Sequence, residues 1–342
     1  MLTMALATLM SIVMFDAKVS LSGDDCDYIL AADAFWHHFA FPGHHGSLYP
    51  IVLSPFVGLF GYRLVLLKFL SVLFTVGAFG FLYKAFERRI PSAVLIPSML
   101  LAAICSYIFF YAGYTYSEPL FMLLQSIYFY FFSRYFWVEG GTPSYTLRKD
   151  WKKYLTLGAL TLAMGLTREI GFCVIGVVIL YFAIKGRWKD LLYTVGAALL
   201  MLAAFYLVKA ILWPNVAAGH SFTNLMAKDY YNPNAGMEDA AGLLSRFWDN
   251  SRVYLSAFLC QMMGVVPETP SNRFDADAGR TIVIYVVYFA ALVVIMVRRD
   301  APLLFAGLYA GVLNFASFVV LQIIWAQDRL ITIYYPLILL FL

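Results

Sequence analysis

This sequence predicts an all-α protein that crosses a membrane about ten times, and three observations lead to that fold class. Hydrophobic residues make up 62% of the 342 residues, while charged residues make up only 13%. The apolar residues gather into runs separated by short polar connections, and the mean hydropathy is +0.77. Strand-like alternation and glycine-rich nucleotide-binding loops are absent. A soluble core does not need this composition, but a helical bundle in a bilayer does.

Each apolar run is predicted as a spanning helix, since a hydrocarbon core about 30 Å thick needs about 20 helical residues. The predicted spans have these approximate bounds: 2–20, 63–84, 91–112, 117–137, 154–167, 170–184, 190–212, 281–297, 302–323 and 330–342. The last run is short, so we expect the native chain to continue past Leu342. We treat residues 1–342 as a single transmembrane domain.

Clusters of basic residues predict how the spans are oriented. These clusters lie in four alternate connections, at residues 84–89, 148–153, 185–189 and 298–299. Short loops rich in lysine and arginine usually face the cytoplasm. The other connections then face outside, among them an amphipathic first outer loop at about 21–62 and a long outer segment at about 214–280. Because the net charge of +4 is dispersed among short clusters, we expect no nucleic-acid partner.

The long outer segment predicts one helix that lies against the membrane. That helix is expected to begin near Glu238 and to present an apolar face that includes Leu244 and Trp248. The apolar piece that follows, Tyr254–Val266, is too short for us to predict a further span.

The polar stretch from Gly23 to Pro50 follows the first span. Asp24, Asp25 and Asp27 lie in the sequence Gly-Asp-Asp-Cys-Asp-Tyr, which is predicted to open an amphipathic helix. Helix capping explains one carboxylate, because it accepts hydrogen bonds from free backbone amides. Neighbouring carboxylates also repel each other, which favours proton uptake by one of them, as in a general base. The residues alone leave both capping and catalysis open.

A second polar motif runs from His44 to Pro50. It contains His44 and Tyr49, and Tyr and His at a membrane interface commonly just anchor a helix. His44 and His45 are adjacent, so their side chains point apart and form a weak metal pair. No required cofactor is predicted, and a divalent metal stays open.

Three further charged residues lie at predicted outer ends of spans. Glu118 either complements the dipole of its helix or stabilises a bound hydroxyl or ion. Arg168 lies between two short predicted spans, so we expect a recessed turn beside a watery cavity. There Arg168 either pairs with Glu169 or binds phosphate through its planar guanidinium. Arg329, in the turn before the last run, offers a second guanidinium of this kind.

Taken together, these motifs resemble the glycosyltransferase C superfamily, most closely its protein O-mannosyltransferases and lipid A aminoarabinose transferases. The family pattern contains, in order, G-D-E-x-x-Y, P-L-Y-P, S-E-P-L-F, L-T-R-x-E-G and D-R-Y. The similar segments here are Gly23–Tyr28, Ser47–Pro50, Ser117–Phe121, Leu166–Gly171 and Asp328–Leu330. The chain departs from the pattern at Asp25, Ile170 and Leu330.

The resemblance implies an inverting glycosyltransferase of a bacterial-type inner membrane, which takes a hexose or pentose from a polyprenyl-phosphate donor outside the cytoplasm. Asp24 would be the catalytic base, and Asp25 its support or a metal or acceptor contact. Arg168 and Arg329 would hold the donor phosphate. The remaining predicted substrate-binding residues are Glu118, His44, Tyr49 and Asp27. The acceptor is a lipid, a glycan or a protein hydroxyl, as in cell-envelope glycosylation, and membrane lipids surround the chain.

A secondary transporter or flippase for a lipid-linked sugar or small anion is the alternative, because it also carries membrane carboxylates and broken helices. The inverted repeats common in that class are not evident here. An O-antigen polymerase-like enzyme and a relative that has lost catalysis are further alternatives. A carrier changes no covalent bond, so donor turnover separates it from an enzyme.

Overall fold

The computed structural model describes residues 2–18, 23–43, 46–137, 147–216, 226–229, 231–267, 276–322 and 327–342. These residues are mainly helical, and one isolated antiparallel bridge joins Ala227 to Met237. The first helices are α1 (Leu2–Val13), α2 (Gly23–His38), α3 (Leu48–Phe60), α4 (Leu64–Phe86), α5 (Ser92–Ala103), α6 (Ser106–Ala112) and α7 (Ser117–Phe136). Then follow α8 (Leu147–Thr167), the 3-10 helix η1 (Glu169–Cys173), α9 (Val174–Ile184), α10 (Trp188–Leu212) and the 3-10 helix η2 (Pro233–Ala235). The last elements are α12 (Ala240–Ser251), the π-helix η3 (Arg252–Leu259), α13 (Cys260–Met262), α14 (Ala278–Arg298), α15 (Ala301–Val320), α16 (Arg329–Thr332) and α17 (Tyr335–Phe341).

Four helices in the described ranges are long and apolar enough to cross a membrane: α4, α10, α14 and α15. A fifth span is present if α5 and α6, which are bent by 54° relative to each other, count as one broken helix. The predicted all-α class is confirmed, and these helices indicate a multi-pass membrane protein. Fewer than the ten predicted spans are evident, so that number is corrected. Helices α7 and α8 are long enough to cross a membrane, but neither combines sufficient hydropathy with few charged residues.

Three predicted spans are built differently from what hydropathy indicates. Helix α1 has only 12 residues, and the run 170–184 is divided between η1 and α9. The run 330–342 is divided between α16 and α17, and side chains such as Leu337 are buried inside the protein. Hydropathy alone does not distinguish a chain segment packed in a protein core from one that faces lipid.

Helix α8 corrects a further expectation. The run 154–167 predicts a short span and hence a recessed turn, but the helix begins at Leu147 and has 21 residues. At 1.5 Å per residue it is about 32 Å long. The charged residues before Tyr154 extend the helix because lysine and arginine are good helix formers. The turn that carries Arg168 is therefore not recessed by a short helix.

The predicted amphipathic helix of the long outer segment is present as α12. Asp239 caps it by accepting a hydrogen bond from the Gly242 amide at 2.7 Å. Phe247 packs on the ring of Phe315, with centroids 5.2 Å apart, whereas Leu244 on the other side is exposed. The next segment, η3 and α13, is apolar because it is buried in the protein.

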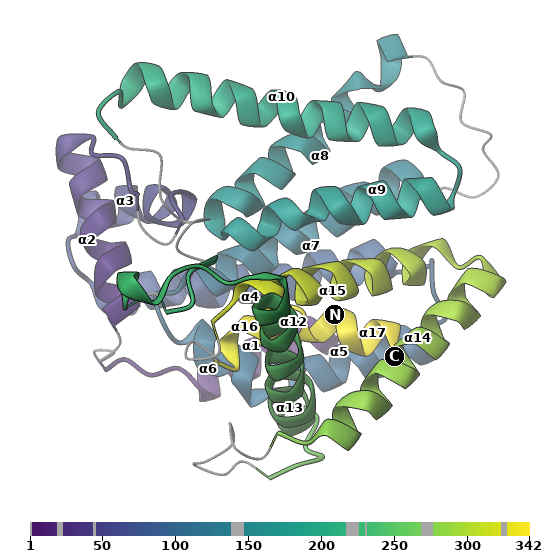
Figure 1. Cartoon of the computed structure of the whole chain (residues 1–342). Coiled ribbons are helices and arrows are strands. Elements are labelled where there is room, and N and C mark those ends of the chain that lie inside the picture. Colours follow the sequence, from purple (N-terminus) through teal and green to yellow (C-terminus); the bar gives the residue numbers. More distant parts are fainter. Residues whose placement is uncertain are drawn as a thin grey trace.

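Helix α7 packs along α4 and α8, and α10 in turn covers α8 (Figure 1). Aromatic rings join α7 to α15: Phe132 stacks on Phe305 with centroids 3.9 Å apart, and Phe129 meets Tyr309 edge to face. All four rings are buried. The first turn of α7, which carries Glu118, is thus part of a well-packed helix.

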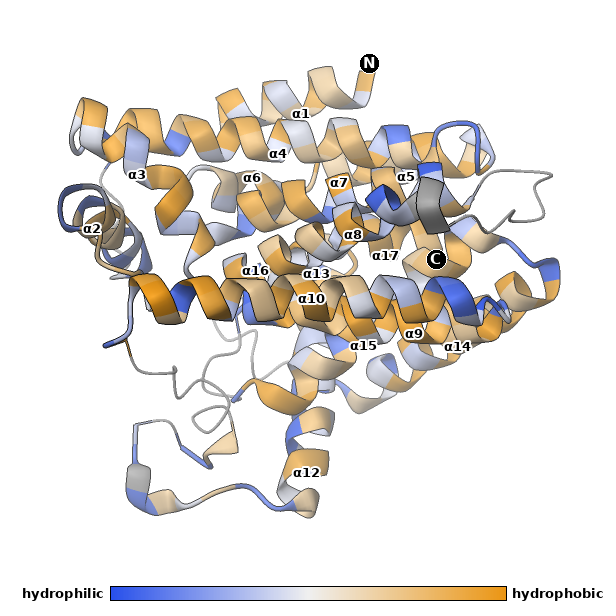
Figure 2. Ribbon diagram, turned by 90° about the horizontal axis from the view of Figure 1, so that it is seen from above, coloured by the Kyte–Doolittle hydropathy of each residue, from blue (hydrophilic) through white to orange (hydrophobic). Residues whose placement is uncertain are grey.

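The peripheral helices present apolar surface outward. Only 11% of the apolar window of α10, and 11% of that of α14, is buried in the protein. Figure 2 shows α10 as a mostly hydrophobic rod along one side of the molecule, while α2 is largely hydrophilic. A lipid environment accounts for exposed helices of this composition, since lipid tails solvate apolar side chains and the helix satisfies its own backbone.

A second, smaller core positions α2 beside the start of α7. It contains Tyr28 of α2, Tyr49 and Leu53 of α3, and Leu120 of α7, all buried. The rings of Tyr28 and Tyr49 meet edge to face at 5.0 Å. This packing brings the acidic first turn of α2 toward the first turn of α7.

Gly171 allows η1 to lie against the end of α8, so its replacement by alanine is expected to destabilise the protein. A Cβ atom at Gly171 would lie 2.5 Å from the Met164 carbonyl carbon, which is backbone and cannot move aside cheaply. Such overpacking costs about 1–3 kcal/mol. Gly176→Ala is the matched control, because its Cβ would meet only Val312 Cγ1 at 3.5 Å. The midpoint of thermal unfolding in detergent is measured for each variant. Equal midpoints for the two variants would contradict this packing.

Candidate functional site

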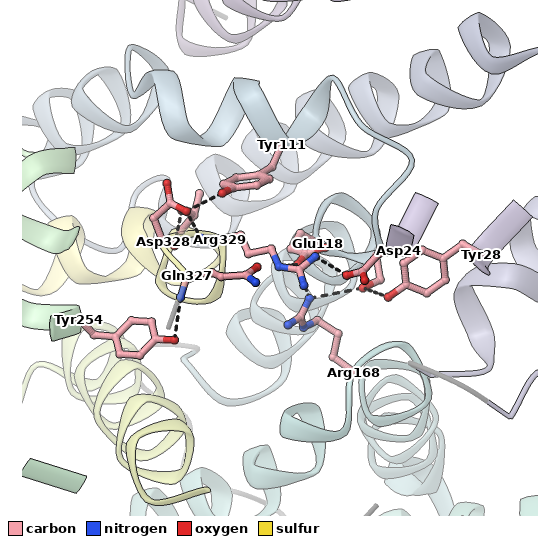
Figure 3. A network of polar contacts seen from close by, with 11 residues as sticks. Asp24, Tyr28, Tyr111, Glu118, Arg168, Tyr254, Gln327, Asp328 and Arg329 are labelled. Atoms are coloured by element: carbon pink, nitrogen blue, oxygen red, sulfur yellow. Dashed lines mark hydrogen bonds and ion pairs between the residues drawn. The ribbon is translucent and has the colours of Figure 1, made fainter. Parts of the chain in front are cut away.

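Four charged side chains from four different elements meet in the bundle, as Figure 3 shows. Asp24 comes from α2, Glu118 from α7, Arg168 precedes η1, and Arg329 begins α16. Arg329 Nη1 lies 2.6 Å from Asp24 Oδ2, and Arg168 Nη1 lies 2.5 Å from Glu118 Oε1. Arg329 Nε is 3.7 Å from the same Glu118 oxygen. We call these four residues the four-charge cluster.

The four-charge cluster is balanced, with two carboxylates and two guanidiniums. Glu118 is its innermost member, with 3% of its side chain exposed, whereas each arginine is 18% exposed and Asp24 26%. Burial lowers the pKa of Arg329, but the carboxylates of Glu118 and Asp24 outweigh burial, and the pKa lies above its usual value. The pKa of Arg168 is likewise raised, because Glu118 outweighs its burial. Both arginines therefore remain charged.

Arg168 is positioned by a hydroxyl pair. Its Nη1 donates to Ser117 Oγ at 3.4 Å, and the Tyr28 hydroxyl donates to the same oxygen at 3.1 Å. Burial, and then the charge of Glu118, raise the pKa of Tyr28, so this hydroxyl stays protonated and can donate. Tyr116 occupies the N-cap position of α7, and Ser117 is the first helical residue. Its hydroxyl is thereby free to orient the guanidinium.

Arg329 is positioned by the turn before α16. The Tyr111 hydroxyl donates to Asp328 Oδ1 at 2.5 Å, and the same oxygen accepts from the Arg329 amide at 3.0 Å. On the other side of the turn, the Gln327 amide donates to the Tyr254 hydroxyl of the π-helix at 3.3 Å. The guanidinium of Arg329 lies over the ring of Tyr116, 5.0 Å from its centroid. Residues of α6 and η3, together with Tyr116 just before α7, thus fix this arginine.

Removing the Tyr111 hydroxyl is expected to loosen this turn. Tyr111→Phe deletes a hydrogen bond to a carboxylate, an interaction that contributes about 1.5–3 kcal/mol. The variant should unfold at a lower temperature in detergent. Tyr83→Phe on α4 is the control: its hydroxyl makes no hydrogen bond within the described residues, so its midpoint should not change. A Tyr111→Phe midpoint equal to that of the control would show that Asp328 is held by other contacts.

The structure brings Asp24, Glu118, Arg168 and Arg329 together, whereas Asp25 and Tyr49 contact other residues. Asp25 is buried, and its Oδ2 accepts from the Thr115 amide at 3.5 Å.

The hydroxyl of Tyr49 lies 3.5 Å from Ser71 Oγ, and Tyr49 is fully buried beneath Tyr28. Asp27 is exposed on α2. The position of His44 lies outside the described residues.

Several residues of the site are not found by sequence reasoning. Tyr28 and Ser117 stand inside recognised motifs, but no pattern shows that their hydroxyls meet across 89 positions. Tyr111 and Tyr254 carry no local signal, because their partners lie 217 and 73 positions away. Spatial proximity alone reveals them.

The space beside the four-charge cluster is narrow. A cavity with an empty volume of about 210 Å³ is lined by Glu118, Arg329, Tyr111 and Thr75, among others, and its gaps are too small for a water molecule. This cavity therefore leaves no water-sized space beside Glu118 and Arg329. Within the described ranges, no three His, Cys, Asp or Glu side chains gather as ligands for a metal ion.

No protein-family model matches the chain, and searches of curated proteins and of solved structures found no match either. The chemistry of the site is therefore the basis for a function. Two fixed guanidiniums are suited to a phosphate, which they bind through paired hydrogen bonds. A partly exposed carboxylate beside them is suited to accept a proton.

Proposed function

We propose that this chain is an integral-membrane glycosyltransferase of the glycosyltransferase C type. It transfers a sugar from a polyprenyl-phosphate donor to an acceptor hydroxyl, with inversion, outside the cytoplasm of a bacterial-type inner membrane. The observation that carries the proposal is the 2.6 Å contact of Asp24 with Arg329, within a cluster that also holds Arg168. A base and a phosphate-binding pair lie side by side, as transfer from a sugar phosphate requires.

The reaction follows from these roles. Asp24 takes the proton of the acceptor hydroxyl, whose oxygen forms a bond to the anomeric carbon. The bond from that carbon to the phosphate oxygen breaks, and its electron pair leaves with polyprenyl phosphate. The phosphate gains negative charge as the bond breaks, and Arg168 and Arg329 stabilise that charge. No nucleotide-binding domain is needed, because the donor is already activated and dissolved in the membrane.

The remaining residues have supporting roles in the proposal. Glu118 lies between two arginines and is almost fully buried, which favours a positioning role over a contact with a substrate hydroxyl. Tyr49 helps to position Tyr28, because the two rings pack edge to face. We assign Asp25 the support of the first turn of α2. In the proposal, Asp27 and His44 contact the substrate. A divalent metal stays open.

The proposal is tested with the purified protein in liposomes that contain radiolabelled polyprenyl-phosphate sugars, hexoses and pentoses in separate reactions. We expect release of polyprenyl phosphate and label in an acceptor from the same membranes. Arg329→Ala should lose this activity, whereas Arg280→Ala should retain it, because Arg280 pairs with Asp277 at the start of α14, outside the four-charge cluster. Movement of an intact donor across the bilayer, without bond cleavage, would establish a carrier and refute the transferase.

A further inference from the structure

In the four-charge cluster each arginine already faces a carboxylate. We propose that Asp24 occupies the phosphate position on Arg329 in the resting protein, and that a lipid phosphate replaces it there. Asp24 then becomes free to act as a base only after the donor has bound. This inference rests on the proposed function for its catalytic meaning, but the exchange itself concerns binding alone.

The geometry around Arg329 leaves one replaceable partner. One side of the guanidinium faces the ring of Tyr116, and its Nε faces Glu118 at 3.7 Å. Its Nη1 holds Asp24 at 2.6 Å. The adjoining cavity is too narrow for a water molecule, and so for a phosphate. We therefore expect an incoming phosphate to take the place of a carboxylate rather than to enter this cavity.

Burial identifies which carboxylate leaves. Glu118 is 3% exposed and lies 2.5 Å from Arg168, so its removal would leave two guanidiniums without a buried counter-charge. Asp24 is 26% exposed, the most of the four, and stands in the first turn of α2. Its carboxylate can turn toward water at little cost, because an exposed charge keeps its hydration.

The charges of the four-charge cluster favour exchange over addition. A polyprenyl-phosphate sugar is a phosphodiester with one negative charge. If Asp24 stayed, three negative groups would face two arginines, whereas replacement of Asp24 preserves the balance. After transfer the phosphate carries a second negative charge and binds the arginines more strongly. Release of the lipid phosphate lets Asp24 return to Arg329.

The exchange predicts that loss of the Asp24 charge strengthens phosphate binding. Binding of polyprenyl phosphate, without a sugar, is measured by calorimetry on protein in nanodiscs. Asp24→Asn removes a charge-assisted competitor and should bind about tenfold more tightly than the wild type. Arg329→Ala should bind at least about tenfold more weakly. Asp33→Asn is the control, because Asp33 lies on the same helix but pairs with exposed His37.

Equal or weaker binding by folded Asp24→Asn would overturn the exchange. Should Asp24→Asn not fold, the wild-type chain gives a second readout, because exposed Cys26 lies two residues from Asp24 and can carry a fluorescent label. Addition of polyprenyl phosphate should change its emission in the wild type but not in Arg329→Ala. An unchanged signal in the wild type refutes the exchange.

Two further results separate this inference from the transferase. Tighter binding by Asp24→Asn without any sugar transfer by the wild type would support the exchange and refute the transferase. Sugar transfer by the wild type, with phosphate binding unchanged in Asp24→Asn, would support the transferase and refute the exchange. Inorganic phosphate is measured in parallel, and equal affinity for it would overturn the assignment to a lipid.

Discussion

Asp24→Asn is expected to lower the rate of sugar transfer by about 10²–10⁴-fold, the usual contribution of general base catalysis. The amide keeps the shape of the side chain but cannot take the acceptor proton. Transfer is measured with the labelled donor in liposomes, at saturating donor, so that binding does not limit the rate. Because the same change is expected to tighten phosphate binding, turnover and affinity should move in opposite directions.

The control for this experiment is Asp33→Asn, which removes a partly exposed carboxylate from the same helix, where it pairs with His37. It should transfer sugar at the wild-type rate. Folding of each variant is checked by its thermal midpoint. Wild-type turnover by a well-folded Asp24→Asn protein would falsify the assignment of Asp24 as the base.

Glu118→Gln is expected to cause the largest loss of stability. Glu118 separates Arg168 and Arg329 at the most buried point of the four-charge cluster. Without its charge, two partly buried guanidiniums repel each other, and only Arg329 keeps a carboxylate partner, Asp24. Breaking a buried ion pair by removing one partner costs about 3–5 kcal/mol. Chemical unfolding in detergent micelles measures the change.

Two comparisons make the Glu118 prediction specific. Asp277→Asn removes the charge of an exposed pair with Arg280 and should cost less than about 1 kcal/mol. The double variant Glu118→Leu with Arg168→Met removes both charges and should be more stable than Glu118→Gln, since the remaining guanidinium, Arg329, keeps Asp24 and no longer faces a second arginine. A Glu118→Gln protein as stable as Asp277→Asn would show that the arginines are held apart by other contacts.

Sequence reasoning was most accurate where one physical property decided the outcome. Helices α4, α10, α14 and α15 agree with predicted spans because each combines length, apolarity and few charges. The same reasoning overestimated the number of spans. The run 330–342 is apolar because it packs inside the protein, and α8 begins within a charged segment that hydropathy excludes.

For the site, the sequence supplied the candidates and the fold selected among them. The resemblance implied that Asp24, Arg168 and Arg329 act in one site, and these side chains lie in one cluster. Glu118 was expected near them, yet its place between two arginines was not. His44 stays a prediction.

The sequence by itself determined a helical chain suited to lipid, because a bilayer requires each backbone to satisfy its hydrogen bonds within the segment. It also determined which charged residues were available for chemistry. Only the tertiary structure decided which carboxylate pairs with which arginine. Asp24 and Arg329 lie 305 positions apart, and their contact depends on how α2, α7 and α16 pack together. Local sequence cannot encode a contact between residues so far apart in the chain, because the contact results from side-chain packing along the whole bundle.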